Sequence, residues 1–89
     1  MQDYTLWNVA TWRIRAIIEW RGMNQDVVDA LGTISDDRKR TIANNAWASS
    51  AEINRASGLV LYLQSQLGLS DAEVDDIFTE AEQITLDNF

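Results

Sequence analysis

The residues best suited to recognition chemistry lie near the start of the chain, where tryptophans and arginines interleave. They are Trp7, Trp12, Arg13, Arg15, Trp20 and Arg21. Rings and guanidinium groups in this arrangement can stack on the bases of a single-stranded nucleic acid. Both residue types are also enriched in the hot spots of protein–protein interfaces. In a third interpretation the tryptophans fill a small core, and the arginine stems cover them. All three stay open here, and the protein-binding interpretation supplies the site prediction.

The residue types that most enzymes need are missing from this sequence. It has no histidine, which is the usual general base and the commonest metal ligand. It has no cysteine, which excludes a thiolate zinc site, a catalytic thiol and a disulfide. The motifs Gly-x-Ser-x-Gly and Ser-x-x-Lys are absent, and Asp71, Asp75 and Asp76 do not have the spacing of a calcium-binding loop. We therefore expect no enzyme activity, no metal and no cofactor.

The net charge of −7 is concentrated at one end of the chain. Residues 1–55 carry seven basic and seven acidic side chains, whereas residues 56–89 carry seven acidic side chains and no basic one. An acidic end repels phosphate backbones, so nucleic acid is not the expected partner. Its carboxylates could instead mimic nucleic acid on a basic protein, or could simply keep a helix face solvated. This alternative binding surface consists of Asp75, Asp76, Glu80 and Glu82.

The clearest helix boundaries fall between residues 67 and 78. Gly68 is typical of a helix end, because glycine adopts the left-handed conformation without a Cβ clash. Ser70 and Glu73 have the spacing of a capping box, which starts the next helix. The apolar residues Val74, Ile77, Phe78 and Ala81 then follow at helical spacing. This pattern predicts a helix that ends near residue 67 and an amphipathic helix that follows it.

The whole pattern predicts an all-α fold, a compact bundle of four to five helices. We expect them at about residues 5–21, 25–31, 36–55, 58–67 and 71–84. Ser35 is the expected N-cap of the third helix. Its expected buried stripe comprises Ile42, Ala43, Ala46, Trp47, Ser50 and Ile53. Residues 1–89 form a single domain in this prediction, with a short tail at 85–89 whose Leu86 and Phe89 could dock on the bundle.

Residues 4–21 also fit a strand, because Trp12, Ile14 and Ile18 alternate with mostly polar neighbours. We favour a helix, since a single strand here would have no partner elsewhere in the chain. In a helix, successive residues turn by about 100°, so Trp12 and Trp20 lie about 80° apart and Trp7 lies about 140° from Trp12. The three rings cannot share one buried face. At least one is therefore expected to be exposed or covered by another chain.

Several short motifs between residues 34 and 81 recur together in one known group of proteins. They are Arg38-Lys39-Arg40, Ala46-Trp47, Ile53-Asn54-Arg55, Ser57, Leu59-Val60, Leu67-Gly68-Leu69-Ser70-Asp71 and Val74-Asp75-Asp76-Ile77-Phe78. In these motifs the chain resembles small helical proteins of unassigned function encoded by tailed bacteriophages. The resemblance implies a role in the virion or in its assembly. It covers about half of the chain and implies no binding residue.

These observations predict a protein–protein interaction module, a minor virion, tail-region or assembly protein of a phage that docks on structural subunits or on itself. The alternative is a small phage effector that binds and inhibits a host protein through the acidic last helix. No apolar run approaches the roughly 18 residues of a membrane span, and Met1-Gln2-Asp3 lacks the basic start of a secretory signal. We therefore expect the protein in the host cytoplasm or in the virion.

Overall fold

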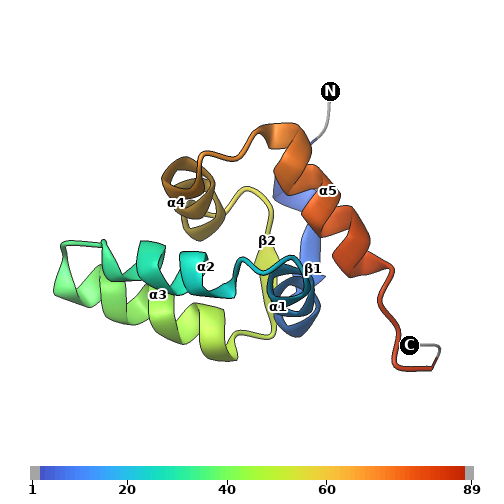
Figure 1. Ribbon diagram of the computed structural model, residues 1–89, viewed down its shortest axis with the longest axis horizontal. Helices are drawn as coiled ribbons and strands as arrows, with labels where there is room; N and C mark the ends of the chain where they lie inside the picture. Colours follow the sequence, from blue (N-terminus) through green and yellow to red (C-terminus); the bar gives the residue numbers. More distant parts are fainter. Residues whose placement is uncertain (1–2, 88–89) are drawn as a thin grey trace.

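The computed structural model describes residues 3–87 and builds them from helices, short loops and one small sheet (Figure 1). In chain order the elements are η1 (Tyr4–Leu6, a 3-10 turn), β1 (Asn8–Ala10), α1 (Thr11–Trp20), α2 (Asn24–Gly32), α3 (Asp37–Ser49), β2 (Glu52–Asn54), α4 (Gly58–Leu67) and α5 (Asp71–Glu82). α1 packs against α5, and α2 packs against both α3 and α4. The predicted helical bundle is confirmed, with a two-stranded sheet added to it.

The junction between α4 and α5 forms as its sequence predicts. Gly68 follows α4 with a φ of +66°, and its backbone N–H donates to carbonyl groups of the last helical turn. The Ser70 side chain accepts from the Glu73 backbone N–H, and the Glu73 carboxylate accepts from the Ser70 backbone N–H. The buried side of α5 consists of Val74, Ile77, Phe78 and Ala81. These signals succeed because each depends only on residues within one or two helical turns.

The prediction of a single helix over residues 5–21 is wrong, because α1 begins only at Thr11. The three residues before it form β1, which pairs antiparallel with β2 and places Val9 opposite Ile53. Both of these side chains are buried. At the end of the ladder the Thr11 backbone N–H donates to the Ala51 carbonyl at 3.2 Å. The expectation that a strand here would have no partner was therefore also wrong; the partner lies about 44 residues later, beyond the reach of local periodicity.

The prediction of a long helix over residues 36–55 is also wrong, because residues near its end form β2, which pairs with β1. α3 ends at Ser49, and Ser50 has extended backbone angles, φ −67° and ψ 149°. The Ser50 hydroxyl donates to the Ala46 carbonyl and also bonds with the Thr11 hydroxyl at 2.9 Å. These bonds hold the end of α3 beside Thr11, where the chain leaves the helix toward β2. Residues 52–54 then gain strand pairing that a continued helix could not provide.

Two expectations about the start and the face of α3 are also corrected. The N-cap is Asp36, whose Oδ1 accepts from the Lys39 backbone N–H at 2.8 Å, and not Ser35. A carboxylate suits this place, because it also meets the positive end of the helix dipole. Ile42 is 53% exposed and so lies outside the buried stripe. Ile53 is buried, but on β2 instead of on a helix.

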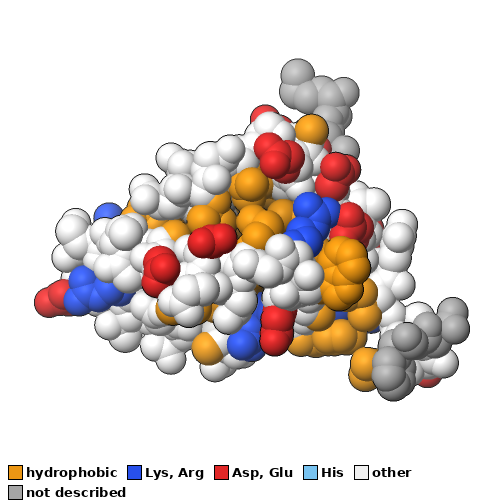
Figure 2. All heavy atoms as spheres, in the orientation of Figure 1, with side chains coloured by type: hydrophobic (Ala, Val, Ile, Leu, Met, Phe, Trp, Pro, Cys, Tyr) orange, Lys and Arg blue, Asp and Glu red, His pale blue; other side chains and the backbone are white. Residues whose placement is uncertain are grey.

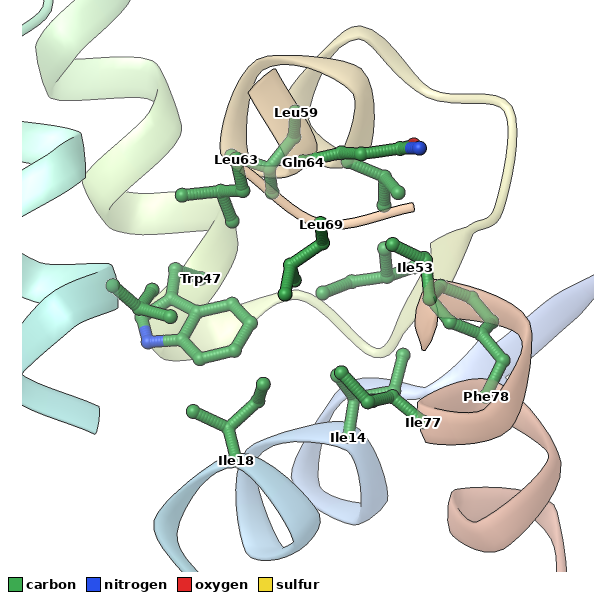
Figure 3. A pocket seen from close by; sticks show the side chains of 13 residues that line it. Ile14, Ile18, Trp47, Ile53, Leu59, Leu63, Gln64, Leu69, Ile77 and Phe78 are labelled. Carbon is green, nitrogen blue, oxygen red and sulfur yellow. The ribbon is translucent and has the colours of Figure 1, made fainter. Parts of the chain in front are cut away.

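One hydrophobic core extends through the described chain and takes side chains from both strands and from helices α1 to α5. Trp47 lies in this core, as predicted, and is 7% exposed. The core contains an apolar cavity of about 50 Å³, which Figure 3 shows between Trp47, Leu69, Ile14 and Ile18. The packing is therefore continuous around α1 and α5 but leaves space beside Trp47.

Two segments are less covered than expected. α4 is apolar on nearly all sides in sequence, yet Leu61 is 55% exposed while Val60 and Leu63 are buried. In the tail, Leu86 is 69% exposed and does not dock on the bundle, and Phe89 lies outside the described residues. No helix within residues 3–87 is long and apolar enough to cross a membrane.

Candidate functional site

The structure does not bring the six predicted site residues together on one surface. Trp7 is one of those that lie elsewhere. It lies between η1 and β1 instead of on a helix. Its ring meets the Phe78 ring edge-on with centroids 5.6 Å apart, and its Nε1 donates to the Glu82 carboxylate. Trp7 thus holds the start of the chain against α5. Its contacts are those of a structural residue.

Trp12 and Trp20 both lie on the outer side of α1, opposite the buried Ile14 and Ile18. Trp20 is 83% exposed and Trp12 is 44% exposed, which confirms that the tryptophans cannot all be buried. Ala16 lies between them at intervals of four residues, so the three side chains form one row along the helix. Figure 2 shows hydrophobic side chains gathered over and beside α1, next to the acidic side chains of α5. This row is the most exposed aromatic surface in the described chain.

The arginines next to this row have few internal partners. The Arg13 guanidinium lies 5.3 Å from the centre of the Trp12 ring, and its Nε is buried without a hydrogen-bond partner in residues 3–87. Arg15 donates from Nη1 to the Ala48 carbonyl at 3.3 Å. Neither guanidinium forms an ion pair in that range. The α1 face is defined as Trp12, Arg13, Arg15, Ala16, Glu19 and Trp20. It therefore combines exposed aromatic rings with two arginines that form no ion pair and one glutamate.

Arg21 does not belong to this face. Its Nη2 bonds the Glu80 carboxylate and so links the end of α1 to α5. Of the predicted acidic surface, Asp75 accepts from Arg55 and Tyr4, while Glu80 and Glu82 accept from Arg21 and Trp7. Asp76 is exposed, and within the described residues it makes no side-chain hydrogen bond or ion pair. Three of the four carboxylates thus hold α5 to the rest of the fold.

Arg55 is a charged group of the interior that the sequence did not identify as a site residue. Its side chain is 1% exposed and its Nε donates to Asp75 Oδ1 at 3.0 Å. Its Nη2 lies 3.4 Å from Asp71 Oδ1. The Tyr4 ring covers the guanidinium at 4.1 Å, and the Tyr4 hydroxyl donates to Asp75 Oδ2 at 2.9 Å. A buried charge is tolerated only when it is paired in this way, so these partners compensate the desolvation of Arg55.

Two pKa shifts follow from this cluster. The hydrogen bond from Gln64, and then the one from Arg55, hold the pKa of Asp71 below its ordinary value. The pKa of Tyr4 is raised, chiefly because its hydroxyl donates to the Asp75 carboxylate.

The sequence contains one indication of the Arg55 cluster, the distribution of charge: Arg55 is the last basic residue before a stretch with seven acidic residues. Pairing with α5 would have been a reasonable expectation.

A groove of about 610 Å³ lies between the start of α3 and the start of α4. Its walls are mainly apolar, with a lysine and a tyrosine at the edge; they include Ile34, Lys39, Ile42, Ala46, Leu59 and Tyr62. Its size lies within the range of small-molecule pockets. Lys39 is the one basic side chain in its lining, and Asp36 the one acidic side chain, so its charges do not favour a particular occupant.

The comparisons with known proteins identify no family. No protein-family model, no curated protein and no solved structure matches this chain. The resemblance of residues 34–81 to phage proteins therefore stays a prediction. Within residues 3–87, no group of three or more Asp or Glu side chains is placed to hold a metal ion. The α1 face is consequently chosen as the candidate site on its own geometry.

Proposed function

We propose that this chain is a protein-interaction module without enzyme activity, and that it docks on another protein through the α1 face. One observation carries the proposal: Trp20, the last residue of α1, is 83% exposed at the end of a row with Trp12 and Ala16. Tryptophan and arginine together are typical of interface hot spots. A helix presents them with little entropy to lose on binding, which favours affinity.

The exposed tryptophan also provides enough apolar area to matter. Tryptophan offers roughly 150–250 Å² for burial. At about 25 cal/mol per Å², covering the 83% of Trp20 that faces solvent would contribute about 3–5 kcal/mol before binding costs. That range is typical of a single dominant hot-spot residue. The area that Trp20 leaves available for burial against a partner supports the docking role.

The other interpretations have less support from the geometry. Single-stranded nucleic acid needs a basic groove that follows its backbone over several nucleotides, whereas the α1 face offers two arginines beside Glu19 and the acidic helix α5. The alternative effector role, in which the acidic last helix inhibits a host protein, needs free carboxylates. Asp75, Glu80 and Glu82 already accept hydrogen bonds from other side chains of this chain, Glu80 and Glu82 at its surface. The phage setting, with a partner among virion or assembly subunits, is part of the proposal and comes from the resemblance of residues 34–81.

The test compares the wild-type protein with the double variant Trp12→Ala, Trp20→Ala, each tagged and recovered from the cells that produce it. We expect the wild type to retain a stoichiometric protein partner and the variant to lose at least nine-tenths of it, while the Tm changes by only a few degrees. Leu61→Ala is the matched control, because it removes a half-exposed apolar side chain on α4 and should leave capture unchanged. Equal capture by wild type and double variant would contradict the proposal. The mass of the purified protein in solution shows whether the partner is a second copy.

A further inference from the structure

We propose that the partner segment bound by the α1 face is acidic: an apolar side chain with a carboxylate on either side of it. This inference rests on the proposed function, since it names the chemistry of the partner that the α1 face would bind. It follows from three observations: the unpaired arginines, their placement on both sides of the tryptophan row, and the gap at Ala16.

The first observation is the distribution of ion pairs. Acidic side chains outnumber basic ones by 14 to 7 in this chain, so most cations could find a carboxylate. Arg21, Arg40 and Arg55 each do so. Arg13, Arg15, Arg38 and Lys39 do not, within residues 3–87, and of these four only Arg13 and Arg15 lie beside the exposed aromatic rings. The surface that carries two exposed tryptophans thus has two arginines without an ion pair, beside the single carboxylate of Glu19.

The second observation concerns the Arg13 guanidinium. Its Nε is covered by protein but lacks an acceptor in the described chain. A buried donor without an acceptor is unfavourable, and a carboxylate is the acceptor that an arginine binds most strongly. Arg15 donates from Nη1 to a backbone carbonyl at 3.3 Å, which is a long and weak hydrogen bond. A partner cannot reach the buried Nε, but the terminal guanidinium nitrogens of Arg13 and the Nη2 of Arg15 have no acceptor within residues 3–87 and could donate to a carboxylate of the partner.

The third observation is the geometry of the row. Trp12 and Trp20 are eight residues apart, or about 12 Å along the helix axis, and the small Ala16 side chain leaves a gap between the two rings. At about 100° per residue, Arg13 and Arg15 lie on opposite sides of Ala16 around the helix. A partner would therefore place an apolar side chain over Ala16 and a carboxylate on each side.

The experiment is a selection from a library of displayed random peptides against the intact protein, with the Trp12→Ala, Trp20→Ala variant used to remove peptides that bind elsewhere. We expect the surviving peptides to share Asp or Glu on both sides of an apolar residue. Their affinity should fall at least tenfold in the Arg13→Gln, Arg15→Gln variant. Arg38→Gln is the matched control: it also removes a positive charge, from α3, and should leave affinity unchanged. Fluorescence titration of the tryptophans with a synthetic selected peptide gives the affinities.

The other outcomes are decisive. Selected peptides that bind the α1 face but are basic or uncharged would overturn this inference and leave the proposed function standing. A selection without any binder that depends on Trp12 and Trp20 would count against both. Tryptophan-dependent binding of a dT oligonucleotide, or formation of a dimer lost in the Trp20→Ala variant, would also overturn the inference, because the occupant would then be a nucleic acid or a second copy.

Discussion

Replacing Asp75 by alanine tests how the fold tolerates a charge in its interior. Asp75 provides the closer of the two carboxylates around Arg55, at 3.0 Å from its Nε. Asp71, at 3.4 Å and with its side chain 71% exposed, would remain as the single acidic neighbour. The variant therefore leaves a guanidinium whose side chain is 1% exposed with half of its compensation removed.

Removing one member of a buried ion pair typically costs about 3–5 kcal/mol, because the other charge stays desolvated. Asp75 itself is 31% exposed at its side chain, and water can enter part of the space it leaves. We therefore expect a loss near the lower limit, about 3 kcal/mol. An 89-residue domain has a free energy of unfolding of about 4–13 kcal/mol, so the variant loses a large share of its stability. The corresponding fall in Tm is at least about 10 °C.

The assay is urea unfolding followed by tryptophan fluorescence, with Asp76→Ala as the matched control. Asp76 is the next residue of α5, is exposed and carries the same charge, so its loss should change the free energy of unfolding by no more than about 0.5 kcal/mol. Adding Arg55→Met to Asp75→Ala should recover part of the loss, because the unpaired cation is then gone. Equal effects of Asp75→Ala and Asp76→Ala, or no recovery in the double variant, would refute the reasoning.

Three further predictions concern other parts of the fold. Because the pKa of Tyr4 is raised in the folded state, stability should be complete below about pH 10 and fall as the pH rises through the folded-state pKa; Tyr4→Phe should flatten this decline in unfolding measurements across that range. Ser70→Ala removes the capping box of α5 and should cost about 1 kcal/mol by urea unfolding, whereas no loss would show that the cap is dispensable. Val74→Ile adds one methylene beside the 50 Å³ cavity and should raise stability by about 0.5–1 kcal/mol, while a lower Tm would mean that the space is not free.

The helix boundaries that could be predicted are those encoded in adjacent residues. The end of α4 at Gly68 and the start of α5 at Ser70 follow from a glycine conformation and a capping box, and both are local. The β1–β2 ladder could not be predicted in this way. It depends on Val9 meeting Ile53, and a helix pattern fits each segment considered alone. Pairing over such a distance leaves no periodic signal in either segment.

The candidate site, too, could be predicted from the sequence only in part. Angular arithmetic along one helix predicts that Trp7, Trp12 and Trp20 cannot share one buried face, so that at least one is exposed, and the structure exposes Trp12 and Trp20. The calculation does not apply to Trp7, because Trp7 does not lie on a helix. The Arg55 cluster joins η1, the end of β2 and α5, three segments whose proximity exists only in the folded chain. In the sequence, the only indication of this cluster was the excess of acidic residues in the C-terminal third of the chain.

The most direct test of the α1 face as a docking surface is site-specific photo-crosslinking in the cells that produce the protein. A benzophenone side chain replaces Trp20 in one variant and Leu61, on α4, in another, since both positions are more than half exposed. Mass spectrometry of the irradiated samples then compares the adducts. We predict one discrete protein adduct from position 20 that is absent from position 61. The same adducts from both positions, or none from position 20, would contradict docking through α1.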